Sequence, residues 1–263
     1  MRRYLSILGG YFAQYFKARI AHRGDFVISL LSSLFATAAS FGFVLVLFQR
    51  VPSLKGWSFH EVLFIYAFSL LPLGLFNIVS LNLYEFGEAY VIEGKFDRVL
   101  LRPINALFQV IFEAFRLEAL QEIVLGLGIL AYASYKLGIS WGPIEVLLLV
   151  LMSASGGLIY VSIFLALTSV SFWMEDRIGI SPPVFNMIAF GRYPMTIYNT
   201  AVQFFLSWII PLAFASFYPT TGFLRHGDFR VYFYLVPLVA AVAFSISALI
   251  WSRGVRHYGS TGS

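Results

Sequence analysis

The chain has 263 residues, of which 59% are hydrophobic and 12% charged, and its formal net charge is +5. Because a water-soluble domain carries about a quarter of its residues as charged side chains, this composition excludes a water-soluble globule and predicts a surface that faces lipid. The absence of cysteine excludes disulfides, thiolate metal sites and a cysteine nucleophile.

The first part of the chain, residues 1–24, predicts an amphipathic helix that lies at the membrane surface. Aromatic and apolar residues recur there at helical spacing, and basic residues flank them. Membrane anchoring alone would account for this pattern. The recurring residues are Tyr4, Leu8, Tyr11, Phe12, Tyr15 and Phe16.

Six apolar segments follow that can each form a span, since a helix needs about 20 mostly apolar residues to cross a bilayer. All but the third are free of charged residues. Pro211 and Pro219 divide the uncharged run Tyr193–Leu224 into the fifth span and a shorter interfacial or re-entrant segment. The expected spans are Phe26–Phe48, Val62–Leu83, Phe115–Tyr135, Val146–Phe172, Met195–Phe217 and Tyr232–Ser252.

The basic residues are distributed unequally between the two sides of the membrane. With both termini in the cytoplasm, 13 of the 18 Lys and Arg residues fall in cytoplasmic segments, among them Arg192 ahead of the fifth span. The five on the outside are Arg50, Lys55, Lys136, Arg225 and Arg230. The positive-inside rule therefore predicts cytoplasmic termini and an even number of crossings. Because the position of the basic residues matters more than their sum in a membrane protein, we expect no nucleic-acid partner.

Sequence patterns for nucleotide and metal binding are missing. No part of the sequence carries the phosphate-binding pattern Gly-x-x-x-x-Gly-Lys-Ser/Thr, so the chain is not expected to hydrolyse ATP. The four histidines lie in different segments, without the spacing of metal ligands. We therefore expect that the chain is not an enzyme and binds no cofactor or metal of its own.

The segment between the second and third spans, residues 84–103, interleaves charged and apolar side chains. It predicts two short amphipathic helices on either side of Gly94, of which the second ends before Pro103. In one interpretation a protein partner receives the apolar residues while the charges set its orientation. In the other, the apolar face rests on the bilayer. The apolar residues are Phe86, Tyr90, Val91, Ile92, Phe96, Val99 and Leu100.

Part of this segment resembles a loop of bacterial permeases within the type-2 ABC transporters, in which Gly-x-x-Asp-x-x-Leu-x-Arg-Pro follows the second span. The residues are Glu93-Gly94-x-x-Asp97-x-x-Leu100-Leu101-Arg102-Pro103. Further matches occur in the order of that family and spread over most of the chain. They are Arg192-Tyr193-Pro194, Ile210-Pro211-Leu212-Ala213-Phe214 with Tyr218-Pro219, and Tyr258-Gly259-x-x-Gly262-Ser263.

The resemblance implies an all-α integral membrane protein with one permease domain over residues 1–263. It implies six spans, an interfacial helix over 1–24, a coupling helix within 84–103 and short re-entrant helices before the sixth span. It also implies the bacterial cytoplasmic membrane, both termini in the cytoplasm, and export. Such permeases work in pairs, each docked on a separate ATPase subunit that binds ATP and Mg²⁺. The implied partners are an ABC ATPase subunit, a second permease (identical or homologous) and the lipid bilayer.

By the same resemblance, Glu88 to Arg102 of this segment would sit in a cleft of the ATPase and pass its closure to the spans. The residues expected to couple to the ATPase are Glu88, Glu93, Gly94, Asp97, Arg98, Arg102 and Pro103. Asp97 and Arg102 are expected to fix the docked geometry. The alternative is that they pair with each other, or cap the short helices, within this chain.

The third span contains ionisable residues, which cost about 3 kcal/mol each in hydrocarbon. Glu118 and Glu122 lie four residues apart, hence on one helical face, with Gln121 beside them. Either these residues line the translocation path or a contact between two permeases, or the helix starts later and they lie at headgroup level. No other expected span contains a charge.

Two other functions are compatible with a multi-span protein. An ion- or proton-coupled carrier would need functional charges in several spans, and only the third offers any. A non-transporting scaffold or sensor would need the 84–103 segment to bind some other protein. The sequence leaves open the substrate and the choice between a homodimer and a heterodimer of permeases.

Overall fold

The computed structural model describes residues 2–21, 23–174 and 181–259. Every regular element within these ranges is helical, which confirms an all-α protein. Five of the described helices are long and apolar enough to cross a membrane. They are α2 (Arg23–Arg50), α3 (Phe59–Ser80), α6 (Leu120–Leu137), α7 (Pro143–Val170) and α12 (Arg230–His257).

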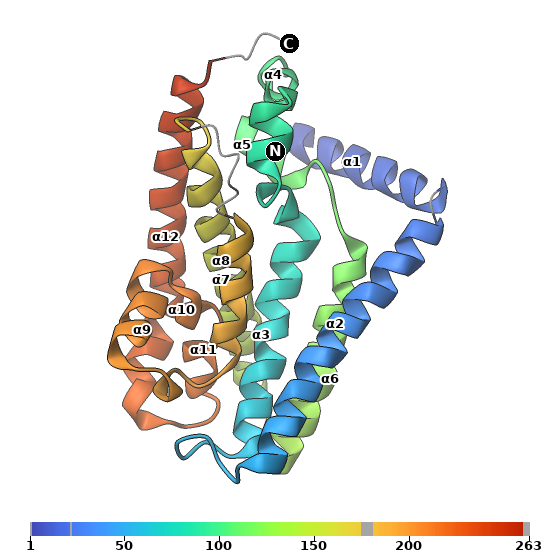
Figure 1. Ribbon diagram of the computed structural model, residues 1–263. Helices are drawn as coiled ribbons and strands as arrows, with labels where there is room; N and C mark the ends of the chain where they lie inside the picture. The colour runs from blue at the N-terminus through green and yellow to red at the C-terminus, as the bar shows by residue number, and fades with distance from the viewer. Residues whose placement is uncertain (1, 22, 175–180, 260–263) are drawn as a thin grey trace.

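The crossing expected over Met195–Phe217 is not a continuous helix, and this part of the prediction was wrong. Pro194 and Pro211 each stand at the start of a new short helix, because a proline lacks the N–H that would continue the preceding one. Figure 1 shows that the chain from α8 onward leads in short helices toward the end of the bundle where α12 begins, so this part of the chain is broken into pieces. The pieces are α8 (Ser181–Met187), α9 (Thr200–Phe204), α10 (Leu212–Ser216) and α11 (Tyr218–Thr221).

Irregular backbone is tolerated at membrane depth only where protein surrounds it. The short helix α10 meets this condition, since all five of its residues are buried. Gly156 of α7 permits the close approach, because a Cβ atom there would collide with the carbonyl oxygen of Ala215. The hydroxyl of Ser216 donates a 2.7 Å hydrogen bond to the carbonyl oxygen of Gly191, which satisfies another buried backbone group.

The centre of the bundle is α3, which packs along both α6 and α7, while α7 packs along α12. Of the apolar stretch of α3, 78% is buried, against only 6% of that of α2. In Figure 1, α2 diverges from α3 toward the end of the bundle where α1 (Arg2–Ala21) lies. Most of the surface of α2 is therefore free to meet lipid or another chain.

The helix expected within residues 1–24 is present as α1, which lies across one end of the bundle (Figure 1). Part of its apolar face is covered by this chain itself. Tyr4 packs edge-on against Phe108 of α5 (Ala106–Phe112), and Phe12 packs edge-on against Phe115. The final turn of α12 reaches the same end of the bundle, as an even number of crossings requires.

Candidate functional site

The 84–103 segment folds into two short helical pieces at the end of the bundle that also carries α1. A π-helical turn (Gly87–Ile92) and α4 (Lys95–Leu100) are joined at Gly94, whose φ of 72° favours glycine. The second piece ends ahead of Pro103. Two short helices around Gly94, as the sequence predicts, are therefore confirmed.

The aromatic face of the segment is buried within this chain rather than left for a partner. Phe86 and Phe96 are fully buried and pack against the rings of Phe172, just after α7, and Trp251 of α12, with ring centroids 5.1–5.9 Å apart. Such ring pairs contribute about 0.5–1.5 kcal/mol beyond their buried area. The interpretation in which a partner receives the apolar residues is thus wrong for most of them. Those that stay exposed are Ile92, Leu100 and Leu101.

Asp97 is held by the residue that follows the last helix. The hydroxyl of Tyr258 donates a 3.0 Å hydrogen bond to Oδ1 of Asp97, and its ring packs edge-on against Phe96. Burial, and then the bond to Asp97, raise the pKa of Tyr258 to about 12, so this hydroxyl keeps its proton at physiological pH. Two of the sequence motifs behind the family resemblance therefore meet in space.

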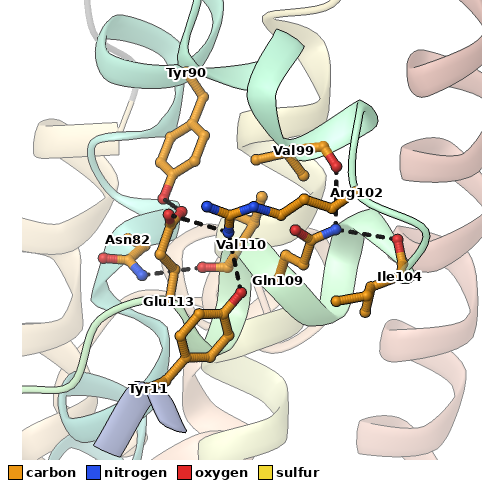
Figure 2. A network of polar contacts seen from close by, with 9 residues as sticks. All are labelled: Tyr11, Asn82, Tyr90, Val99, Arg102, Ile104, Gln109, Val110 and Glu113. Carbon is orange, nitrogen blue, oxygen red and sulfur yellow. Dashed lines mark hydrogen bonds and ion pairs between the residues drawn. The ribbon is translucent and has the colours of Figure 1, made fainter. Parts of the chain in front are cut away.

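Arg102 belongs to a second polar network, which joins the segment to α1 and α5 (Figure 2). Its Nη1 donates a 3.3 Å hydrogen bond to the hydroxyl of Tyr11 and lies 4.0 Å from Oε1 of Glu113. The hydroxyl of Tyr90 donates to Oε2 of Glu113 at 2.7 Å. Burial, and then Glu113, raise the pKa of Tyr90 well above its usual range. The described contacts of Arg102 and Asp97 thus go to different residues of this chain, not to each other.

Two amide side chains, of which Gln109 is buried, bind backbone groups beside this network (Figure 2). Nε2 of Gln109 donates to the carbonyl oxygens of Val99 and Ile104, at 3.1 Å each, and so ties the end of α4 to α5. Asn82 donates from Nδ2 to the carbonyl oxygen of Val110 at 3.0 Å. These hydrogen bonds connect α4, and the residues just before the segment, to α5.

The remaining side chains of the segment face away from the bundle and form what we call the outer rim. Its charged members are two acidic residues followed by two basic ones, and Glu93 pairs with Lys95 at 2.7 Å. Since an exposed ion pair contributes little to stability, these charges are better suited to orienting a partner. The rim consists of Glu88, Ile92, Glu93, Lys95, Arg98, Leu100 and Leu101.

The acidic residues of the third span lie where a 3₁₀ turn (Leu117–Ala119) leads into α6, so the helix begins later than expected. Glu118 and Glu122 are nevertheless buried, and both line a cavity of about 390 Å³ to which α2, α3, α6 and α8 contribute. Tyr15 of α1 donates to Oε2 of Glu118 at 3.1 Å. Asn77 of α3 donates to the two carboxylate oxygens of Glu122 at 3.0 and 3.1 Å.

Gln121 faces α2. Its Nε2 donates to the hydroxyl of Ser33 at 2.8 Å and to that of Thr37 at 3.4 Å. The hydroxyl of Tyr66 in α3 donates to the carbonyl oxygen of Thr37 at 2.9 Å. Polar bonds between spans therefore attach the otherwise exposed α2 to the bundle.

Arg192 lies inside the bundle, so its expected place in a cytoplasmic loop was wrong. Its Nη1 donates to the hydroxyl of Ser40 at 3.2 Å, and its guanidinium lies 5.9 Å from the ring centre of Tyr66. Ser40 is about 15 Å from the end of α2 at Arg50, given a rise of about 1.5 Å per residue. The position of Arg192 also shows that the third span is not alone in containing a charged residue, whereas the sequence predicted that it would be. The cause is the broken crossing, which begins at α8 and includes Arg192.

Comparison with known protein families places the chain in one of them. A family model described as ABC-2 family transporter protein matches residues 34–262, which is most of the chain. The chain belongs to this family. It is therefore a multi-pass membrane protein and the permease subunit of an ABC transporter, and its family implies an ABC ATPase subunit as a partner. No curated protein and no solved structure matches it.

Membership of the ABC-2 family favours a permease over a carrier that works alone and over a scaffold that transports nothing. The permease is the membrane component of such a transporter, and hydrolysis of ATP belongs to another subunit. Within the described ranges, no group of three or more His, Cys, Asp or Glu residues could hold a metal ion.

Sequence reasoning missed several residues of this ABC-2 permease. Glu113 and Asn77 are single polar residues whose partners lie 23 and 45 positions away, and no local spacing marks such pairs. Tyr258 carried a signal, since it belongs to one of the family motifs, but its contact with Asp97 follows only from the fold.

Proposed function

We propose that this ABC-2 permease exports its substrate across the bacterial cytoplasmic membrane, driven by ATP that a separate ABC ATPase subunit hydrolyses. The observation that carries the proposal is how the 84–103 segment is built. Its outer rim is exposed at the end of the bundle, whereas its aromatic face packs onto the ends of α7 and α12. A push on the rim by the closing ATPase would therefore move the spans with it.

The residues assigned to coupling act in three ways in this proposal. Gly94 and Pro103 shape the backbone, the first by its positive φ and the second by following the end of α4. Asp97 and Arg102 are positioning residues, which hold the segment through Tyr258 and through the network around Glu113. The residues that would touch the ATPase are Glu88, Glu93 and Arg98.

A second permease, identical or homologous, completes the transporter in this proposal. The exposure of α2 supports it, because pairing along this helix would cover apolar side chains that the bundle leaves open. Leu31 and Phe35 are two of these, with 60% and 77% of their surface exposed. The polar bonds of Gln121 and Arg192 would hold the opposite face of α2 against its own bundle.

We place both termini and the 84–103 segment in the cytoplasm. Moving Arg192 from the cytoplasmic set to the interior leaves 12 basic residues inside against five outside, so the charge asymmetry still supports this orientation. The whole chain would act as one permease domain. ATP and Mg²⁺ would bind in the partner ATPase and not in this chain.

The test is purification in mild detergent of the chain expressed with its genomic neighbours, followed by mass identification and an ATPase assay. We expect a stoichiometric ATPase partner. The rim variant Glu88→Lys with Arg98→Glu should release it, whereas Lys136→Glu, an exposed reversal at the opposite end of the bundle, should not. Purification without any nucleotide-binding subunit, under conditions that keep membrane complexes intact, would contradict the proposal.

A further inference from the structure

The cavity at the start of α6 has several hydrogen-bond acceptors in its wall. Its volume is about 390 Å³, and Glu118, Glu122 and Asn77 contribute to its wall. Asn77 is only 9% exposed and uses its Nδ2 on Glu122. In the part of the chain that the structure describes, its Oδ1 has no hydrogen-bond partner. Because a buried acceptor without a donor is costly, the cavity is prepared for a ligand that donates hydrogen bonds.

The charge of Glu122 is a second feature of the cavity wall. Glu122 is buried against a neutral amide, and no described cation lies within ion-pair distance of its carboxylate. Arg116 stands on the cavity wall but pairs with Glu85 at 3.7 Å. Arg192 interacts with Glu122 only by long-range electrostatics, because the hydrogen bond of its guanidinium goes to Ser40 of α2. A buried carboxylate of this kind gains from a cationic partner.

We propose that this cavity binds a protonated amine group of the transported substrate. The ammonium would donate to the carboxylate of Glu122 and to Oδ1 of Asn77. An ammonium has three donors and no acceptor, which matches a wall that offers acceptors. The inference rests on the proposed function, because the cavity lies toward the end of the bundle from which an exported substrate would enter.

Other ligands fit the cavity less well. An anion would be repelled by the two carboxylates, and a metal ion would want more ligands than the described residues bring together. Phe185 of α8 also lines the cavity, and its ring offers a surface both to a cation and to the carbon stem that carries it. An amine on an apolar body meets all of these conditions.

Binding is measured on the whole chain, with its ATPase partner, in lipid nanodiscs, and empty nanodiscs correct for partition into lipid. The probes are 1-naphthylmethylamine, which is protonated at neutral pH, and 1-naphthalenemethanol, a neutral molecule of nearly the same shape. We expect the amine to bind at least tenfold more tightly than the alcohol. Glu122→Gln should lower the affinity for the amine to that for the alcohol, and Asn77→Leu should lower it severalfold. Glu145→Gln, at the other end of the bundle, should change neither.

Equal binding of the two probes to the native chain would overturn the inference, as would an unchanged affinity for the amine in Glu122→Gln. If that variant does not fold, Ser29→Asp provides a second test, since Ser29 also lines the cavity. The added carboxylate should raise the affinity for the amine severalfold, and no rise would count against the inference. The ATPase partner reports separately on the proposed function, because these variants leave the outer rim intact.

Discussion

The hydroxyl of Tyr258 donates a 3.0 Å hydrogen bond to Oδ1 of Asp97, across 161 positions of sequence. The bond joins the chain just after α12 to α4. The last span and the 84–103 segment are therefore linked by this hydrogen bond as well as by the packing of Phe96 against Trp251 and Tyr258. In the proposed coupling, a displacement of the segment would therefore act on the last span.

Tyr258→Phe tests this link, because it removes the hydroxyl and keeps the ring against Phe96. We expect a loss of about 1 kcal/mol in the free energy of unfolding, the usual net value of one hydrogen bond, together with slower ATP hydrolysis by the assembled transporter. Thermal unfolding and an ATPase assay measure the two effects. Tyr135→Phe, which changes an exposed tyrosine at the other end of the bundle, is the matched control. A normal rate of hydrolysis in Tyr258→Phe would show that coupling does not need the bond.

The raised pKa of Tyr258 predicts a dependence of stability on pH. Its pKa of about 12 exceeds the ordinary value of 10, so the folded chain holds this proton more tightly than the unfolded chain does. The resulting stabilisation is complete below pH 10 and is lost as the pH rises toward 12. The stability difference between the native chain and Tyr258→Phe should therefore shrink across that interval. Difference absorbance of tyrosinate follows the ionisation directly, and a midpoint near pH 10 would refute the prediction.

The network around Glu113 predicts unequal effects for its two donors. Tyr90→Phe removes a part-buried 2.7 Å hydrogen bond to a carboxylate and should cost about 1.5 kcal/mol of stability. Arg102→Lys weakens a half-exposed contact of 4.0 Å and should cost less than about 1 kcal/mol. Thermal unfolding of the two variants and of their combination measures both values. A larger loss in Arg102→Lys than in Tyr90→Phe would mean that the arginine, not the tyrosine, holds Glu113 in place.

The contact between α7 and α10 predicts that Gly156→Ala disrupts the broken crossing. The added methyl group would collide with the carbonyl oxygen of Ala215, which belongs to a buried backbone segment that cannot yield easily. We expect poor recovery of monodisperse protein and a lowered melting temperature. Gly128→Ala in α6 is the matched control, since a Cβ atom there meets no other atom within 4 Å. That variant should be neutral or slightly more stable, because alanine favours a helix by about 1 kcal/mol over glycine. Equal behaviour of the two variants would rule out the close contact.

The pair of Asn77 and Glu122 predicts compensation between two substitutions. Asn77→Leu leaves a buried carboxylate without its amide donors and should cost about 3 kcal/mol. Adding Glu122→Leu removes the stranded charge, and the double variant should recover much of that loss. The melting temperatures of both variants measure the recovery. A double variant less stable than Asn77→Leu would show that Glu122 has another stabilising contact.

The sequence predictions that were confirmed concern segments in which neighbouring residues all favour the same secondary structure. The uncharged runs within Arg23–Arg50 and Phe59–Ser80 do form long helices, because twenty apolar residues have few alternatives in lipid. Gly94 and Pro103 likewise mark the turn and the end of the two short helices in the 84–103 segment. The hydropathy of Met195–Phe217 wrongly predicted a continuous span. Prolines interrupt the helix there, and the surrounding helices bury the interrupted backbone away from lipid.

The candidate site shows the same division. Its position between the second and third spans, its two helices and its charged rim could be predicted from residues adjacent in sequence. The burial of Phe86 and Phe96 could not, since the rings that cover them come from α12 and the end of α7. The partners of Asp97 and Arg102 were also missed, because Tyr258 and Tyr11 lie at opposite ends of the chain.

By itself, the sequence determined that this protein lies in a membrane, where most of its long helices run and where the two short helices of the 84–103 segment meet. These properties depend on composition, local periodicity and nearby turn residues, all of which are written along the chain. Only the tertiary structure decided that Arg192 lies within the bundle, that Glu122 and Asn77 share a cavity, and that Tyr258 holds Asp97. Each of these depends on side chains from helices far apart in sequence, and their meeting is set by how the helices pack.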